Sequence, residues 1–561
     1  SIYFIAGNHT DPPENFDASR MKSNWSEDLL LPRQWDARGH ARGKLAPGGW
    51  VAITDPDGKT WEMFSNGYRN PFDMDFNADG ELFVYDADME WDLGTPWYRP
   101  TRVMHTTSGA EFGWRSGTGK WPAYFPDSLP ALSDIGPGSP VGVTFGYGTK
   151  FPAKYQKAIY LLDWTFGTIH VVHPKASGAS YTATKEEFLS RSPLPLTDAV
   201  VGSDGALYFT VGGRGAQSEL FRVTYTGDAS TAPVDAKDTE FAELRSIRRR
   251  LEMYHNDNSS NAKTVEFIWP FLGHNDRHIR FAARTALEHQ GLKLWQQRVL
   301  AEDDAETLMS AVIALARQGD KSLEPQILEA LDRIDIGALT DMQKLALLRA
   351  YGLTIVRMGQ PNQPTADHIS QKLDPLYPAK TDDLNRELSR VLVALNSPTV
   401  ITKTLKLMHA ESQQKPEEFG ELLARNAGYG GTIAAMLANR PEIQKIHYAL
   451  VLRNMRYGWT LEQRKEYFAW FGPAMQRSGG ASYVGFIKNI RDEALANLSA
   501  AEKKALDSES LIVVVKAAEL PKPKGPGHAW RLDEMVGLSK TGLTGRNFEN
   551  GLRTYAAARC V

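Results

Sequence analysis

Over residues 1–226, apolar and polar positions alternate in short segments, the pattern of strands with one buried face. Turns separate these segments, and the unit Asp-Gly-x-Leu-aromatic occurs at 79–83 and again at 204–208. The expected strands include 50–54, 72–76, 82–85, 158–162, 168–172 and 220–223. Many short strands between turns predict a sandwich, barrel or propeller, and the recurring turn unit favours a propeller.

From about residue 238 to 518, apolar residues recur instead at helical spacing. The clearest segment is 274–287, where Asp276 is a candidate N-cap. Its apolar stripe consists of Ile279, Ala283, Ala286 and Leu287. Segments 303–317 and 341–351 continue the pattern. Stacked helix pairs of this kind bury each other's faces, so the pattern predicts a solenoid that resembles HEAT repeats.

Composition shifts divide the chain further. Residues 227–237 form a polar linker between the β region (1–226) and the helical repeat domain (238–518). A second linker, 519–540, is rich in Pro, Lys and Gly over 521–527 and precedes a short segment, 541–561. That segment holds a candidate helix through Leu552, Tyr555 and Ala556, which leads to Cys560.

Both ends of the chain are abrupt. Ser1 precedes an apolar run of the kind that elsewhere follows an Asp-Gly turn, and Cys560 is the penultimate residue. We therefore expect an internal fragment of a longer protein, a β-propeller lacking its N-terminal blades and a truncated domain at the C-terminus.

Charge and hydropathy exclude two classes of partner. The formal net charge of −3 offers no electrostatic attraction for nucleic acid. No run of about 18 apolar residues is present, so no transmembrane segment is predicted in this fragment. The single cysteine excludes an intrachain disulfide.

Candidate chemistry is concentrated in residues 66–115, and within this stretch four acidic residues occupy every second position. These residues are Asp86, Asp88, Glu90 and Asp92. In an extended segment they project from one side, and two carboxylates about 5 Å apart repel by roughly 3 kcal/mol at an effective dielectric of 20. The row therefore needs water, cations or a metal. Oxygen ligands suit Ca²⁺, and the alternative is pairing with Arg99 and Arg102.

Residues Arg69 and Asn70 are a second candidate group, because Arg can fork onto a carboxylate and Asn both donates and accepts hydrogen bonds. The alternative is that the pair only joins two loops. His105 and Arg115 flank 108–114 and can face the same cavity, although a lone His is more often a hydrogen-bonded structural residue.

Two further residues come late in the β region. If the sheets close into a ring, Asp198 and Arg214 would lie at the same end of the propeller as the candidates in 66–115. The glycine fragment Gly117–Lys120 lacks the spacing of a phosphate-binding loop.

The order of three motifs carries a family resemblance. Gly67-Tyr68-Arg69-Asn70-Pro71, then Asn77-Ala78-Asp79-Gly80-Glu81-Leu82, then Gly113-Trp114, is similar to the G-x-R-N, DG-x-L and G-W run of soluble pyrroloquinoline-quinone (PQQ)-dependent sugar dehydrogenases. The stretches 36–40, 91–100 and 150–152 more closely resemble large secreted bacterial proteins, abundant in planctomycetes. Those proteins join such a propeller to HEAT-like helices and a C-terminal cytochrome c.

The resemblance implies a PQQ-type sugar or alcohol dehydrogenase that passes electrons to a C-terminal c-type haem. It implies PQQ and Ca²⁺ as cofactors, a sugar or alcohol substrate, an electron acceptor and a periplasmic or secreted location. Arg69 and Asn70 carry over from the family as cofactor contacts, and the further candidates for cofactor binding are Arg102, His105, Arg115, Asp198 and Arg214. Cys560 would begin the C-x-x-C-H motif that attaches haem.

The same resemblance places the catalytic histidine upstream of Ser1, so the catalytic residue is unassigned and the fragment is expected to be inactive. His9 lies downstream of that place and is not assigned the role. The acidic row departs from the sugar-dehydrogenase pattern. An alternative function is a non-catalytic adaptor, in which propeller and solenoid bind a glycan or protein and carry an electron-transfer cytochrome.

Overall fold

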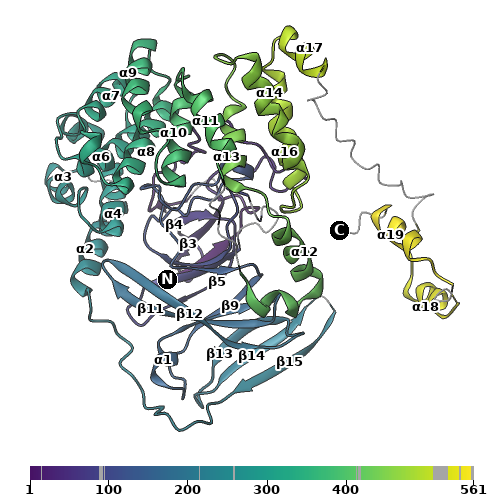
Figure 1. Ribbon diagram of the computed structural model, residues 1–561. Coiled ribbons are helices and arrows are strands. Elements are labelled where there is room, and N and C mark those ends of the chain that lie inside the picture. Colours follow the sequence, from purple (N-terminus) through teal and green to yellow (C-terminus); the bar gives the residue numbers. More distant parts are fainter. Residues whose placement is uncertain are drawn as a thin grey trace. The chain divides into compact units, whose positions relative to one another are not determined.

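The computed structural model (Figure 1) describes residues 1–13, 16–87, 93, 95–213, 215–256, 260–411, 414, 418–508, 528–541 and 545–557. Contacts divide the chain into two compact units, Ser1–Ala505 and Leu506–Val561. The first unit contains four β-sheets followed by a long series of helices, so a β region precedes an α region as the sequence predicts.

Four sheets follow one another along the chain, and nearly all neighbouring strands are antiparallel. The first has the order β1-β3-β4-β2 and the second β5-β6-β7-β8. Their strands are β1 (Ile2–Ala6), β2 (Ala18–Ser19), β3 (Gly49–Thr54), β4 (Trp61–Tyr68), β5 (Asn70–Phe76), β6 (Leu82–Ala87), β7 (Thr101–Thr106) and β8 (Ser133–Gly136). The short 3₁₀-helix η1 (Gly117–Gly119) lies between β7 and β8.

The third sheet runs β9-β10-β11-β12 and the fourth β13-β14-β15. Their strands are β9 (Pro140–Phe145), β10 (Ile159–Asp163), β11 (Thr168–Ser177), β12 (Ser180–Ser190), β13 (Leu196–Val201), β14 (Leu207–Gly213) and β15 (Ala216–Val223). A single helical turn, α1 (Ala153–Gln156), interrupts the strands. The strands expected at 50–54, 72–76, 82–85, 158–162, 168–172 and 220–223 are all present.

The first strands of consecutive sheets lie side by side: β1 contacts β5, β5 contacts β9, and β9 contacts β13. Two carboxylates join β5 to β9, because Asp73 accepts the backbone N–H of Val143 (2.7 Å) and Asp75 that of Phe145 (2.8 Å). Burial raises the pKa of both carboxyl groups. Apolar side chains fill the space between neighbouring sheets.

The helices of the α region begin after residue 241. They are α2 (Ala242–Glu252), α3 (Ala262–Ile268), α4 (Arg277–Glu288), α5 (Gln296–Leu300), α6 (Ala305–Gln318), α7 (Glu324–Asp332), α8 (Asp341–Met358), α9 (Gln363–Leu373), α10 (Asp382–Ala394), α11 (Val400–His409), α12 (Ala427–Ala438), α13 (Ile443–Leu452), α14 (Leu461–Ala469), α15 (Phe471–Met475), α16 (Tyr483–Ala496) and α17 (Ala500–Ser508). Short 3₁₀-helices connect them: η2 (Met253–Asn256), η3 (Trp269–Phe271), η4 (Leu292–Leu294), η5 (Lys321–Leu323), η6 (Ile336–Ala338), η7 (Asp374–Leu376) and η8 (Gly420–Arg425).

Helix packing follows chain order, with α2 against α4, then α6, α8, α10, α13 and α16 in turn, and Figure 1 shows these helices in a continuous row. Helix α4 begins as predicted, because the Asp276 side chain accepts the N–H of His278 (2.8 Å) and Ile279 (3.1 Å). Helix α8 extends to Met358, beyond the expected 341–351, and starts with a capping box formed by Thr340 and Gln343.

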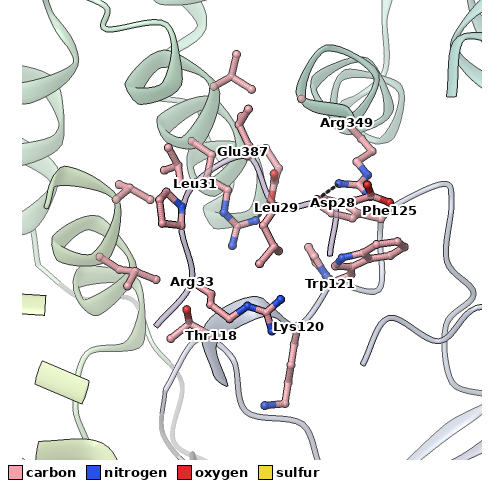
Figure 2. Close-up of a pocket in the computed structure, with 18 of the residues that line it drawn as sticks. Asp28, Leu29, Leu31, Arg33, Thr118, Lys120, Trp121, Phe125, Arg349 and Glu387 are labelled. Atoms are coloured by element: carbon pink, nitrogen blue, oxygen red, sulfur yellow. Dashed lines mark hydrogen bonds and ion pairs between the residues drawn. The ribbon is translucent and has the colours of Figure 1, made fainter. Parts of the chain in front are cut away.

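The β and α regions share one interior. Phe281 of α4 is 2% exposed and belongs to the same apolar cluster as Val51, Leu82 and Met104 of the first two sheets. Segment 28–33 also runs between the regions. Figure 2 shows it beside a small cavity of about 60 Å³, with Arg349 of α8 donating to the Asp28 carbonyl oxygen (2.9 Å).

After α17, the described residues of the second unit form the helices α18 (Leu532–Thr541) and α19 (Phe548–Ala557). Helix α19 was expected from the sequence, but α18 lies within the segment 519–540 that the sequence assigns to a linker. Its apolar residues Leu532, Met535 and Val536 follow helical spacing, which explains the helix. Among the residues that the structure describes, no helix combines the length and apolar character needed to cross a bilayer.

Candidate functional site

The Arg69–Asn70 pair lies where the chain passes from the first sheet to the second. Strand β4 ends at Tyr68 in the first sheet and β5 begins at Asn70 in the second, so Arg69 alone joins them. Gly67 allows the preceding turn, because its φ is +81°. This single-residue connection fixes two adjacent polar side chains where β4 ends and β5 begins.

Asp86 at the end of β6 holds this connection in place. Its carboxylate accepts the backbone N–H of Asn70 (2.8 Å) and of Arg69 (3.3 Å). It also accepts a hydrogen bond from Arg102 Nη2 of β7 (3.2 Å), and both side chains are almost completely buried. A buried carboxylate with three N–H donors is well satisfied, so Asp86 orients the connection that carries Arg69 and Asn70.

His40 contacts the Arg69 side chain directly, with 3.2 Å between Arg69 Nη2 and His40 Nε2. Arginine only donates hydrogen bonds, so Nε2 accepts and the imidazole is neutral. Burial, followed by the positive charge of Arg69, lowers the pKa of His40, while Asp36 opposes that shift. Asp36 also fixes the backbone of this loop by accepting the N–H of Arg38 and His40.

The turn after β1 completes the group. The N–H of Asn8 donates to the Arg69 carbonyl oxygen (2.7 Å), and the His9 ring lies 5.9 Å from the His40 ring. A Cβ on Gly7 would lie 2.8 Å from Asn70 Oδ1, so glycine permits the close approach. The side chains of His9 and Asn70 are exposed. We name His9, His40, Arg69 and Asn70 the His–Arg–Asn cluster.

This donor set fits an anionic, hydrogen-bonding ligand. Arg69 carries a permanent positive charge, Lys120 acts electrostatically on His40, and Asn70 presents an exposed amide. A planar quinone that carries carboxylates presents the oxygen atoms that such donors bind. The residues present therefore fit PQQ.

His105 occupies a different place, between the second sheet and helix α2. Its Nε2 donates to Glu81 (3.0 Å) and its Nδ1 accepts from Ser180 Oγ (2.8 Å), as the carboxylate can only accept. Glu81 also binds Arg248 (2.5 Å) and Arg249 (2.7 Å) of α2. Burial opposes ionisation of Glu81, but Arg248 and His105 outweigh it and lower the pKa of Glu81. Burial lowers the pKa of His105.

Arg115 is buried in a third place. It donates to the Ser26 carbonyl oxygen (3.0 Å) and to Glu111 (3.2 Å), and its guanidinium lies 4.0 Å from the Trp121 ring. Asp198 is exposed on β13, where it accepts its neighbour's N–H (2.7 Å), and its charge adds to burial in raising the pKa of Asp73. Of the described candidates, the structure thus brings together Arg69, Asn70 and Arg102 through Asp86.

Several candidates lie outside the described residues: Asp88, Glu90, Asp92, Arg214 and Cys560. Asp86 does not fit a Ca²⁺ ligand, because nitrogen donors surround its carboxylate. Within the described ranges, no group of three or more His, Cys, Asp or Glu side chains could hold a metal ion.

Sequence reasoning missed the role of His40 and Glu81. His40 stands in the stretch 36–40 that carries the family likeness, and the spacing Asp36-x-x-x-His40 was a usable signal. His9 was discounted, but the structure places its ring beside that of His40. Glu81 gave no signal, because its partners Arg248 and Arg249 lie far along the chain.

No protein-family model matches this sequence, and no curated protein matches it. Similar solved structures include a glucose dehydrogenase (17% identity, TM-score 0.26), which matches over 34% of this chain and 57% of its own. A PQQ-bound aldose sugar dehydrogenase from Streptomyces coelicolor matches over 31% and 51% (14% identity, TM-score 0.24). A soluble aldose sugar dehydrogenase from Escherichia coli, in its apo form, matches over 28% and 46% (16% identity, TM-score 0.24).

The chain spans about half the length of these solved structures. TM-scores this low do not establish a shared fold.

Proposed function

We propose that the chain is part of a PQQ-type sugar or alcohol dehydrogenase, whose four sheets are consecutive blades of a β-propeller. The observation that carries the proposal is the Arg69–Asn70 pair at the crossing from one sheet to the next, fixed by Asp86 and flanked by two imidazoles. The contacts of β1 with β5, of β5 with β9 and of β9 with β13 support the interpretation of the four sheets as successive blades. Consecutive blades of a propeller contact each other in this order around a central axis.

In this proposal the side chains of the His–Arg–Asn cluster bind and orient the cofactor. Arg69 donates to a carboxylate, and the exposed Asn70 amide donates to or accepts from a second oxygen. His40 keeps the guanidinium in position, because its neutral Nε2 accepts from Arg69. A bound quinone would supply the oxidising power by accepting two electrons from the alcohol carbon.

Proton abstraction is not assigned to these residues. The cluster offers binding and orientation of a ligand. Proton transfer needs a general acid or base in addition. The proposal extends to electron transfer to a c-type haem attached at Cys560, and to a periplasmic or secreted location. Haem staining of the full-length protein after denaturing electrophoresis tests the haem attachment, because only a covalent haem survives this treatment.

Titration of the purified chain with PQQ tests the cofactor site, with tryptophan fluorescence and calorimetry as readouts. We expect saturable binding that Arg69→Met weakens about tenfold or more, because a charge-assisted contact is lost. The exposed Arg456→Met variant removes the same charge elsewhere and should bind like the wild type. Dye reduction with a panel of aldoses, in the full-length protein, then tests the reaction.

Failure of the full-length protein to bind PQQ would contradict the dehydrogenase proposal. If glycans or a partner protein bind to the β region while PQQ does not, a non-catalytic adaptor function replaces the dehydrogenase proposal. Binding that Arg69→Met and Arg456→Met weaken equally would place the cofactor elsewhere.

A further inference from the structure

A cavity of about 410 Å³ lies where three helices of the α region begin, beside the loop that contains Tyr124 and Pro126. The helices are α4, α6 and α8, whose first residues are Arg277, Ala305 and Asp341. Helix N-termini carry partial positive charge, so three that converge on one cavity favour an anion there.

Three arginines of α4 line this cavity. Arg277, Arg280 and Arg284 share one helix face, because residues three and four apart are neighbours on a helix surface. Two of them have a carboxylate partner: Arg280 pairs with Glu306 (2.9 Å), and Arg284 pairs with Glu288.

Arg277 differs from the other two arginines. No described carboxylate lies within ion-pair distance of it, and Asp127, which acts on its charge, already contacts Arg317 (2.7 Å) and Arg349 (2.7 Å). Burial, followed by the charge of Arg280, lowers the pKa of Arg277 to about 10. Its Nη2 instead donates to the carbonyl oxygens of Ala123 (2.6 Å), Phe125 (2.6 Å) and Ser128 (2.8 Å). Arg277 is therefore half-buried with no carboxylate of its own, an arrangement that costs free energy unless an anion binds.

Two N–H groups of these arginines also lack an acceptor. Arg284 is 5% exposed, and its Nε is buried without a hydrogen-bond partner. The Nε of Arg277 is likewise buried without a hydrogen-bond partner. Buried donors without acceptors are rare in proteins and destabilising, and here both belong to residues that line one cavity.

The acidic residues of the lining are already engaged. Asp304 caps α6 by accepting the backbone N–H (2.9 Å) and the hydroxyl (2.7 Å) of Thr307. Glu306 accepts from Gln343 Nε2 (3.1 Å) in addition to its contact with Arg280. These carboxylates bind protein donors, and the positive charge of Arg277 is left for a ligand.

We propose that this cavity binds the sulfate or phosphate group of a small anionic molecule, with Arg277 as its main ligand and Arg284 as a second. A tetrahedral oxyanion suits several arginine donors and helix ends at once, because it accepts hydrogen bonds in all directions. The cavity exceeds the volume of a bare ion, so the rest of the molecule has room. The bound group would also join loop 123–128 to α4.

Calorimetric titration of the purified chain with sodium sulfate, and separately with sodium phosphate, tests the proposal. Sodium chloride at matched ionic strength controls for screening. We expect one saturable site for sulfate or phosphate, with Arg277→Met weakening it about tenfold or more and Arg456→Met leaving it unchanged. Arg277→Lys keeps the charge without the planar fork and should retain part of the affinity.

Crystals of the wild type soaked with selenate, a sulfate analogue with an anomalous signal, provide a second test that needs no variant. An anomalous peak inside the cavity supports the site. The proposal is overturned if neither ion gives saturable heat, if Arg277→Met binds like the wild type, or if selenate binds elsewhere only. Neither test depends on PQQ, so the dehydrogenase proposal stands or falls separately.

Discussion

At the scale of single residues, buried ion pairs connect the β region to the helices. Glu81 is 4% exposed and joins His105 of β7 to Arg248 and Arg249 of α2. Replacement of Glu81 by Gln should destabilise the protein by about 3 kcal/mol, because breaking one partner of a buried pair leaves the other charge uncompensated. The shift in thermal midpoint, measured by circular dichroism, checks this expectation.

A matched control for this replacement is Glu186→Gln. Glu186 binds Lys154 (2.9 Å) and His173 (2.8 Å) at the surface, where water and salt screen the charges. Its loss should change the thermal midpoint little. Equal effects of the two replacements would show that Glu81 does not join the two regions in the way described.

His255 makes stability depend on pH. It is fully buried, its Nδ1 accepts from Ser108 Oγ (2.9 Å), and its Nε2 donates to the Ala282 carbonyl oxygen (3.0 Å). Burial lowers the pKa of His255 to about 3, against about 6.5 in an unfolded chain. Between these pH values the unfolded chain binds more protons than the folded protein, so stability falls as pH drops below about 6.5.

At pH 5 the contribution of His255 amounts to about 2 kcal/mol of lost stability relative to pH 7 or above. His255→Gln removes the titrating group, so its thermal midpoint should fall less between pH 7 and pH 5 than that of the wild type. The comparison uses the change in thermal midpoint between pH 7 and pH 5 for each protein. A general loss of packing lowers the midpoint at both pH values and does not alter this change. Parallel pH profiles would refute the assignment.

The sequence proposes Arg69 and Asn70 as site residues because their motif is local and has a fixed order. It could not group His40 and His9 with them, because the three loops meet only through sheet pairing and the hydrogen bond from Asn8 to Arg69. It also proposed His105 as a cofactor contact, whereas this side chain binds Glu81 and Ser180. Tertiary partners far along the chain decide such cases, and periodicity carries no signal for them.

At the scale of elements, the end of β4 depends on a glycine. Gly67 has φ +81°, and a Cβ there would lie 1.9 Å from Glu111 Oε1 and 2.5 Å from the Phe112 nitrogen. Gly67→Ala should therefore combine the left-handed strain of about 1–2 kcal/mol with an overpacking cost of about 1–3 kcal/mol. Gly80→Ala has similar strain (φ +75°) but no atom within 4 Å, so it should cost only the strain.

Chemical denaturation of both glycine variants measures the difference. The larger effect at Gly67 should also weaken PQQ binding, if the cofactor proposal holds, because this turn leads directly into Arg69. A Gly67→Ala protein as stable as Gly80→Ala would show that Glu111 and Phe112 move aside freely.

The existence of helices with clear periodicity was predictable, but the residue at which a helix stops was not. The stripe in 274–287 and the Asp276 cap gave the start of α4 correctly, since both are local. The length of α8 and the helix α18 were missed. In α8 the buried run continues to Ile355, past the expected end at residue 351, because neighbouring helices cover it on several sides. In α18 the adjoining Pro-rich segment favoured the prediction of a linker.

At the scale of the whole molecule, buried ion pairs connect the β region to the α region. Contacts group residues 1–505 into one compact unit. Asp28 in the β region binds Arg357 of α8 (2.5 Å), and Asp127 binds Arg349 (2.7 Å). Burial opposes ionisation of Asp127, but Arg349 and Arg317 outweigh it and lower the pKa of Asp127. The arginines of the helices thus compensate the charge of a carboxylate that the fold buries.

Truncation tests this dependence. A chain that ends at Thr226 would leave Asp28, Asp127 and Glu81 without their arginine partners and would expose the apolar cluster that Phe281 completes. We expect it to aggregate, because uncompensated buried charges and exposed apolar surface both disfavour the folded state. A chain that ends at Asp507 keeps all of these contacts and should melt at the temperature of the first unit in the full chain. Size-exclusion chromatography and thermal melting distinguish the two, and a monodisperse, cooperatively melting product from residues 1–226 would mean that the β region folds without the helices.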